Sequence, residues 1–359
     1  MRHLQTGLTL FDERRATPGY TLFSPLGRKT TYLVDMQGKV VHEWHLPGYV
    51  GIYGYLLQNS NLLAAVQTDD GPVGLRGTGG HLVELDWDSN IVWQYIDHHH
   101  HHDQRRCANG NTLYASSRLL PADLAARVPG GQAGTELPVG IYGDVLREID
   151  PSGNIIWEWD AATCEQMYEY PLNPMCSRVE FSHANAVVPL DNGDVLVNFR
   201  YNHLMAIIDR QSKAFKWTLC DWSFGQQHNV HMLENGNLLF FANGSNVLYG
   251  GPTAGSRVIE LDPVTQDIVW EYKGSPTPTF FSWFISGAQR LSTGNTLICE
   301  GAWGRLFEVT PEGDIVWEFI NPFFAEDHPA YKDHNYVFRG YRYAAVSLEI
   351  AGRLNYMPA

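Results

Sequence analysis

The sequence predicts an all-β protein, a six-bladed β-propeller built from four-stranded blades. Charged residues make up only 18% of the chain and aromatic residues 13%, beside 34 glycines and 19 prolines. Few charges with many aromatic and turn residues are typical of a fold made of many short strands. An internal repeat is the second observation, because one strand–turn–strand pattern returns six times along the 359 residues.

Each repeat contains an apolar strand that ends in a turn and a second strand of the type apolar-Trp-Glu-aromatic. The six copies end at Trp44, Tyr95, Trp159, Trp217, Tyr272 and Phe319. In the turn Asp-Pro-x-Gly, proline presets φ and glycine tolerates positive φ. Trp157 and Trp159 share one face of their strand, and this aromatic face needs a neighbouring sheet to cover it.

A second element precedes most copies and reads as two short strands joined by an Asn/Gly hairpin turn. The examples are YLLQNSNLLAAV, RRCANGNTLYAS, AVVPLDNGDVLVNF, HMLENGNLLFFA and QRLSTGNTLICE. The two elements together give four strands per unit, at the period of about 40–50 residues expected of propeller blades. The first copy lacks this hairpin, so we expect the C-terminal segment YVFRGYRYAAVSLE to complete that blade and close the ring.

We expect residues 1–359 to form a single domain with two long loops. The stretch 119–144 contains a predicted short helix, PADLAARV, followed by a chain rich in glycine and proline. The stretch 321–343 is polar and aromatic. Long loops in compact domains tend to be functional, so we expect both to lie over the axial site.

Charge and cysteine content restrict the function classes and the compartment. A net charge of −14 argues against nucleic acid or an acidic membrane surface as the partner, because phosphates are repelled. No apolar stretch approaches a signal peptide or a membrane span. The five scattered cysteines lack CxxC spacing, which fits a reducing compartment. We therefore expect a cytoplasmic protein that acts on a small anionic or aromatic molecule.

Five consecutive histidines occupy positions 98–102, in DHHHHHDQRRCANGNTL. The run leads without a break into one of the repeated hairpin turns, so it belongs to the fold and is no affinity tag. Side chains alternate along a strand, so at most alternate histidines of the run are expected to face one way. We expect one or two of these five histidines to take part in catalysis and the others to surround them.

Three histidines occupy matching places in different repeats. His102 and His228 each lie seven residues before the first asparagine of a hairpin turn, and His183 lies nine before its own. The first strand of a propeller blade lines the central axis, and an even difference keeps a side chain on the same face. A single histidine in a strand is more often a packing residue, but three at corresponding places favour one axial site. Asn185 and Arg200 are expected to join it.

The ordered set HHD, HAN, a strand-end arginine and QH resembles the bacterial arylsulfate sulfotransferase family over most of the chain. The family transfers sulfuryl groups without a nucleotide donor on a six-bladed propeller. The resemblance implies that His228 is the nucleophile that becomes sulfated. It implies that His102, His183, Asn185 and Arg200 bind the sulfuryl oxygens. We also expect His101 to bind the substrate. A neutral imidazole can hold the group covalently, and this reading requires no cofactor.

Two other functions stay open at this point. A lyase or hydrolase acting on an acidic carbohydrate or other small anion could use the same histidines as acid and base, with Arg200, Arg342 or Tyr341 on the carboxylate. In that reading His102, His183 and His228 could instead hold a divalent metal ion. The third alternative is a non-catalytic propeller that binds a partner on its flat face.

Overall fold

The computed structural model describes residues 5–247 and 255–354. Within them, six antiparallel sheets of four principal strands each define a six-bladed β-propeller, as predicted. The chain divides into two compact units, one from 1–68, 79–96 and 284–359, the other from 69–78 and 97–283. Among the described residues, no helix has the length and apolarity needed to cross a membrane.

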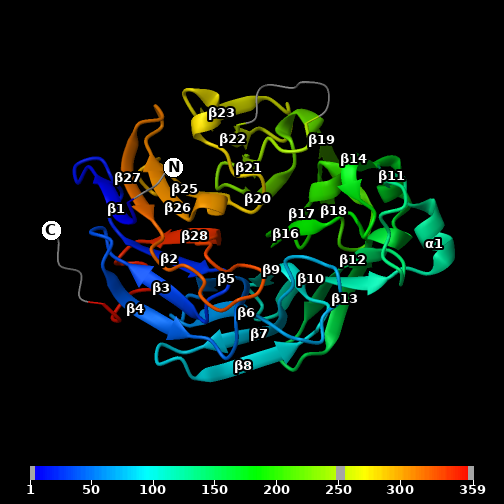
Figure 1. Cartoon of the computed structure of the whole chain (residues 1–359), viewed down its shortest axis with the longest axis horizontal. Helices are drawn as coiled ribbons and strands as arrows, with labels where there is room; N and C mark the ends of the chain where they lie inside the picture. The colour runs from blue at the N-terminus through cyan, green and yellow to red at the C-terminus, as the bar shows by residue number, and fades with distance from the viewer. Residues whose placement is uncertain (1–4, 248–254, 355–359) are drawn as a thin grey trace. The chain divides into compact units, whose positions relative to one another are not determined.

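The first unit holds three of the sheets, labelled in Figure 1. One consists of β28 (Val337–Tyr343), β2 (Tyr20–Pro25), β3 (Thr30–Val34) and β4 (Val40–His45). The next consists of β5 (Val50–Leu56), β6 (Leu62–Gln67), β7 (Gly80–Leu85) and β8 (Ile91–Ile96). The third consists of β24 (Gly287–Arg290), β25 (Thr296–Glu300), β26 (Arg305–Val309), β27 (Ile315–Ile320) and β1 (Gly7–Phe11), with the 3₁₀ turn η6 (Gly301–Trp303).

The second unit holds the other three sheets (Figure 1). One runs β9 (His101–Arg106), β10 (Thr112–Leu119), β12 (Tyr142–Ile149) and β13 (Ile155–Asp160), with the short β15 (Glu180–Phe181) parallel to β12. The next runs β16 (Ala184–Pro189), β17 (Val195–Phe199), β18 (Leu204–Ile208) and β19 (Phe215–Cys220). The last runs β20 (Gln227–Met232), β21 (Leu238–Ala242), β22 (Arg257–Leu261) and β23 (Ile268–Lys273).

Short elements connect the strands of the second unit. They are α1 (Ala122–Arg127), β11 (Gly130–Gln132), β14 (Leu172–Ser177) and the 3₁₀ turns η1 (Ala161–Thr163), η2 (Glu165–Glu169), η3 (Arg200–Asn202), η4 (Trp222–Phe224) and η5 (Thr277–Thr279). Helix α1 lies inside the predicted PADLAARV segment and buries no residue. Strand β11 pairs with β14, so the 119–144 insertion packs on the segment that leads to His183.

The repeated turns are held by a shared hydrogen-bond pattern. In the turn between β9 and β10, Asn109 Oδ1 accepts the backbone N–H of Asn111, and Asn111 Nδ2 donates to Glu148 of β12 at 2.7 Å. Equivalent bonds join Asn61 to Glu84, Asn237 to Glu260 and Asn295 to Glu308. The first asparagine thus fixes the turn, and the second donates to a carboxylate of the third strand. The Asn/Gly pattern therefore specifies the hairpin.

Several tryptophans of the repeat bond to a neighbouring sheet, as expected for packing residues. In the first unit, the indole N–H of Trp44 donates to the carbonyl of Asp86 and that of Trp317 to the carbonyl of Met36. In the second unit, Trp157 and Trp159 donate to Arg210 and Lys213, respectively. Buried indoles need such partners, so the aromatic face predicted from the pattern is covered and satisfied.

Both ends of the described chain take part in sheets of the first unit. Strand β28 pairs with β2 and so completes the first blade, as the C-terminal segment was predicted to do. Strand β1 pairs with β27 and adds a fifth strand to its sheet, which the sequence pattern did not indicate. Closure of the ring, the single domain over 1–359, and the placing of 119–144 and 321–343 over the site stay predictions.

Candidate active site

Irregular backbone at the start of three inner strands positions the histidines. The pairing of β9 with β10, of β16 with β17 and of β20 with β21 shifts register at His101–Gln104, at Ala184–Ala186 and at His228–His231, respectively. His102 and His183 have φ of 57° and 58°, which is left-handed backbone. Bulges re-aim side chains beside functional sites, and here they turn the histidines away from simple alternation.

The structure brings the four predicted catalytic residues together. The rings of His102 and His183 lie 4.3 Å apart between centroids, and His183 stacks on Tyr201 at 4.5 Å. His102, His183 and His228 are all at least 96% buried. Burial, and then the positive charges of His183, His101, His228 and Arg200, hold the pKa of His102 well below its usual range. The cluster therefore disfavours charge on His102.

Arg200 is a cation with no carboxylate partner in the described part of the chain. Its Nη1 approaches His183 Nε2 at 3.4 Å, its guanidinium lies 5.7 Å from the Tyr201 ring, and its buried Nε has no hydrogen-bond partner. Buried arginines are ordinarily paired, because an uncompensated charge in a protein interior is costly. The arrangement suits an anion that accepts from Arg200.

Asn243 fixes the tautomer of His228. The Asn243 Nδ2 donates to the carbonyl of Ser282 at 2.8 Å, so its Oδ1 is the atom that faces His228 Nδ1, at 2.6 Å. An amide oxygen only accepts, so His228 Nδ1 carries the hydrogen. In the neutral ring, Nε2 then has the lone pair that a nucleophile requires.

His183 has a charged partner instead of a neutral one. Its Nδ1 lies 2.5 Å from Glu180 Oε1, and both side chains are almost fully buried. A carboxylate accepts this hydrogen, and a guanidinium only donates, so Nε2 presents its lone pair to Arg200. His183 therefore orients Arg200, while Glu180 fixes the orientation of the His183 ring.

His101 lies next to His102 and contacts its ring. Its Nδ1 lies 3.0 Å from Nδ1 of His102, and its Nε2 contacts the Ser116 carbonyl and Asp144. The predicted substrate-binding role of His101 thus differs from its contacts, which are all within the protein. Of the other histidines in the run, His98 is half-buried and His100 is fully buried. His101 and His102 are adjacent and both buried, so the expected alternation fails at the bulge.

Asn185 also has a role different from the predicted substrate contact. Its Nδ2 donates to the carbonyl of Gln227 at 2.7 Å, and its Oδ1 accepts from Asn198 Nδ2 at 2.6 Å. Asn198 donates to the same carbonyl. These bonds tie β16 and β17 to β20 and hold the strands that carry His183 and His228.

Arg342 and Tyr341 lie on β28 in the first unit. Arg342 is 4% exposed, and its guanidinium bonds to Glu308, to Thr21 Oγ1 and to the carbonyl of Thr17. Its charge is compensated by Glu308 inside the protein, and the contact of Arg342 with a substrate carboxylate stays a prediction. Tyr341 packs against Tyr53 and Tyr55, with centroids 6.1 and 6.4 Å apart.

The predicted alternative of a metal held by His102, His183 and His228 does not match their geometry. Within 5–247 and 255–354, no group of three or more His, Cys, Asp and Glu side chains is arranged to hold a metal ion.

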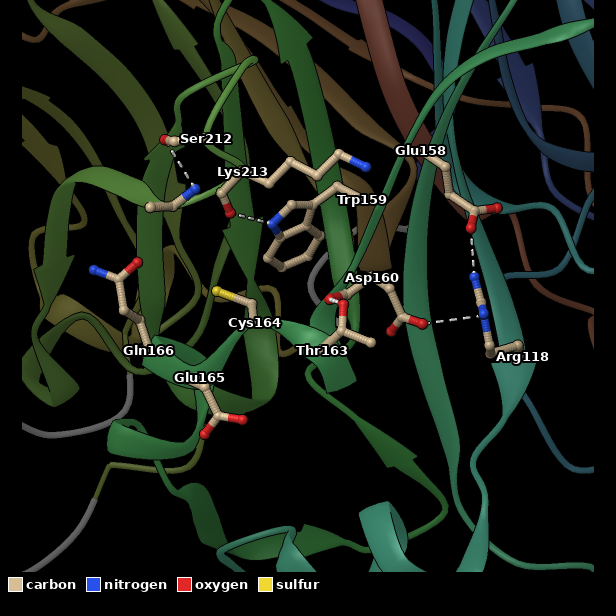
Figure 2. A pocket seen from close by; sticks show the side chains of 11 residues that line it. Arg118, Glu158, Trp159, Asp160, Thr163, Cys164, Glu165, Gln166, Ser212 and Lys213 are labelled. Atoms are coloured by element: carbon tan, nitrogen blue, oxygen red, sulfur yellow. Dashed lines mark hydrogen bonds and ion pairs between the residues drawn. The ribbon is translucent and has the colours of Figure 1, made fainter.

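A surface groove of about 450 Å³ lies elsewhere in the second unit, on β13 and the turn before β19. Figure 2 shows Arg118 paired with Glu158 and Asp160, while Trp159 donates to the Lys213 carbonyl. None of the clustered histidines lines this groove. Arg118 is compensated here by two carboxylates, in contrast to Arg200.

Fold and site together define a β-propeller with a buried cluster of histidines and an arginine that has no carboxylate partner among the described residues. A family model described as arylsulfotransferase (ASST) matches residues 55–322, and the chain belongs to that family. A search of the curated proteins finds no match. The transfer of sulfuryl groups is the general activity that this membership supports.

Two solved structures resemble the chain in fold. A protein of unknown function from Bacteroides caccae is 13% identical with a TM-score of 0.56, over 90% of this chain and 98% of that one. A streptogramin B lyase is 11% identical with a TM-score of 0.48, over 94% and 97% of the two chains. At such identities the likeness concerns the fold alone.

Proposed function

We propose that the chain transfers a sulfuryl group from an aryl sulfate to a phenolic acceptor through a covalent intermediate on His228. Donor and acceptor are small aromatic molecules, and only the donor's sulfate group carries a charge into the cluster. The observation that carries the proposal is Arg200, a cation with no carboxylate partner among the described residues, directly beside the imidazoles.

In the first half-reaction, the lone pair of His228 Nε2 attacks sulfur and forms an N–S bond. The S–O bond to the aryl group breaks, and the phenolate leaves with the electron pair. Arg200 and the neighbouring imidazoles donate to the sulfuryl oxygens, where preorganised donors act most strongly in a site closed to water. The leaving phenolate takes a proton from an imidazole of the cluster.

In the second half-reaction, the acceptor phenol gives its proton to that imidazole, and its oxygen attacks sulfur. The S–N bond breaks and its electron pair returns to His228 Nε2. Asn243 supports this step because its neutral oxygen holds the His228 ring in place. A carboxylate at this position would stabilise the positive charge of the sulfated ring, and the amide oxygen does so less. The sulfated ring therefore stays a good leaving group.

Rapid-mixing kinetics with 4-nitrophenyl sulfate test the proposal. We expect a burst of nitrophenol equal to the enzyme concentration without acceptor, and parallel double-reciprocal lines when donor and acceptor are varied. His228→Gln should lose both, while His231→Gln, on the same strand but bonded to Asn229, should keep them. Intersecting lines with an unchanged rate in His228→Gln would contradict the proposal.

A further inference from the structure

A chain of three side chains links the buried carboxylate of Asp144 to the catalytic cluster. Asp144 Oδ1 lies 3.1 Å from His101 Nε2, and His101 Nδ1 lies 3.0 Å from His102 Nδ1. Asp144 is 1% exposed, and His101 and His102 are 2% and 4% exposed. The His102 ring then meets His183. These contacts come from β12, β9 and the segment before β16.

The partners of His101 allow only one of its nitrogens to change state. Its Nε2 faces the Ser116 carbonyl at 3.0 Å and the Asp144 carboxylate, and both oxygens only accept hydrogen bonds. Nε2 therefore keeps its hydrogen in the neutral and in the charged ring. Any proton that His101 gains or loses is on Nδ1, the atom that faces His102.

The state of His101 consequently decides the tautomer of His102. When His101 is neutral, its Nδ1 accepts, so His102 Nδ1 carries the hydrogen and His102 Nε2 is a base. When His101 is charged, its Nδ1 donates, so His102 Nδ1 accepts and His102 Nε2 carries the hydrogen as an acid. His102 stays neutral in both arrangements.

The charges around each ring favour this division. Burial lowers the pKa of His101, but the hydrogen bond and charge of Asp144, with Glu180, outweigh it and raise the pKa overall. His102 faces positive neighbours instead, as described above. The titratable and charged groups that surround the pair are Asp144, Glu180, His183, His228, Arg200 and His100.

We propose that Asp144, His101 and His102 form a proton relay, in which His102 is the general acid and base and His101 stores the positive charge beside Asp144. This rests on the proposed sulfuryl transfer and names its proton carrier. As the acceptor oxygen bonds to sulfur, its proton goes to His102 Nε2 and the hydrogen of His102 Nδ1 moves to His101 Nδ1. The reverse movement protonates the leaving phenolate. His101 and Asp144 are positioning residues, since neither contacts the substrate.

The leaving group of the donor provides a readout that a merely structural role would not change. 4-Nitrophenolate leaves without a proton, whereas phenolate needs one. His101→Asn cannot store the charge, so we expect its burst rate to be near wild type with 4-nitrophenyl sulfate and to fall by about 10²–10⁴-fold with phenyl sulfate. Asp144→Asn should change in the same direction by a smaller factor. His99→Gln, in the same run but outside the relay, should match wild type with both donors.

Nitrogen NMR of isotopically enriched histidine tests the relay without any turnover. In wild type the His102 signals, assigned by their loss in His102→Gln, should change from the Nδ1–H to the Nε2–H tautomer as pH falls through the His101 titration. In His101→Asn they should keep one tautomer. Equal losses with both donors in a variant whose His102 signals still switch would overturn the relay. If wild type transfers no sulfuryl group but shows the switch, the proposed function fails and the relay stands.

Discussion

The partner of each ring nitrogen distinguishes the roles of the three central histidines. Asn243 gives His228 a neutral acceptor, Glu180 gives His183 a carboxylate, and His101 gives His102 a second imidazole. A carboxylate stabilises an imidazolium and an amide oxygen does so less, so the Asn243 contact suits the neutral nucleophile that we propose at His228. In the proposed mechanism, the cluster holds this nucleophile and the acid–base ring of His102.

Replacing Asn243 by aspartate tests the neutral acceptor. In Asn243→Asp the new carboxylate favours the protonated ring and raises the pKa of His228 by about 1–3 units. The neutral nucleophile then forms only at higher pH, so the acidic limb of the kcat/KM profile should move upward in pH. Rates at high pH should largely recover. Steady-state kinetics across pH measure the shift, and a limb at its original position would argue against His228 as nucleophile.

Removing the guanidinium of Arg200 tests anion stabilisation. Arg200→Gln should lower kcat/KM for an aryl sulfate by about 10²–10³-fold, as the loss of one preorganised donor does. Arg118→Gln is a matched control, because Arg118 is also a partly buried arginine of the second unit but is paired with Glu158 and Asp160. Similar small losses in both variants would show that Arg200 does not act on the sulfuryl group.

At the scale of the elements, close backbone approach holds His102 in place. The His102 N–H donates to the carbonyl of Gly77 at 3.0 Å, and a Cβ on Gly77 would lie 2.4 Å from His102 Nε2. Gly77 has φ of +68°, and Gly110, in the hairpin turn after β9, has φ of +87° with nothing within 4 Å of an added Cβ. Both glycines therefore have positive φ, but only at Gly77 would an added Cβ contact His102.

Alanine at these two glycines separates strain from displacement of the ring. Each substitution should destabilise folding by about 1 kcal/mol, because alanine disfavours positive φ. Only Gly77→Ala should also lower kcat/KM, by at least ten-fold, since its methyl group displaces His102. Urea unfolding and donor kinetics on both variants check this. Equal kinetics in the two variants would mean that the His102 ring position is not critical.

The sequence predicted which histidines lie close together, but not the backbone conformation that brings them there. Equal offsets from the hairpin turns found His102 and His228 because their two blades repeat the same local structure. His183 joins them through left-handed backbone just before β16, not through the alternation used to predict it. Bulges cannot be read from apolar periodicity, so the contacts of Asn185 and His101 within the protein could not be predicted, and their substrate contacts stay predictions.

The orienting residues were missed for a related reason. Asp144 and Glu180 contact the histidines across strands whose register depends on those bulges. Asn243 directly follows β21 in Phe-Ala-Asn-Gly, outside the histidine pattern used to predict the site. The prediction that Arg342 contacts a substrate carboxylate depends on its charge alone. Its partner Glu308 lies on β26, 34 residues earlier in the chain.

At the scale of the whole molecule, the net charge of −14 opposes binding of anions in general. The site therefore attracts a sulfate ester only through local cations. Several histidines are also buried as neutral rings, and burial lowers the pKa of His100 and of His203 to about 4 in each case. His203 Nδ1 accepts the N–H of Gln226 at 3.1 Å, a bond that protonation of this atom would break.

The lowered pKa values of His100 and His203 predict that the protein loses stability in mild acid. Their folded pKa lies below the unfolded value of 6.5, so their contribution is complete above that pH and is lost as pH falls towards 4. Each group can contribute about 3 kcal/mol across this window. The urea midpoint should fall between neutral pH and about pH 5. His203→Gln should flatten the dependence and His334→Gln, at an exposed position, should not; a midpoint constant with pH would refute this.

The most direct measurement of the central claim is the position of the sulfuryl group on the trapped protein. The enzyme is mixed with an aryl sulfate without acceptor, quenched in alkali, digested and sequenced by tandem mass spectrometry. We predict one SO₃ group per chain, on His228, that disappears when a phenol is added before the quench. Release of phenol with no adduct, or with an adduct on another residue, would contradict the account.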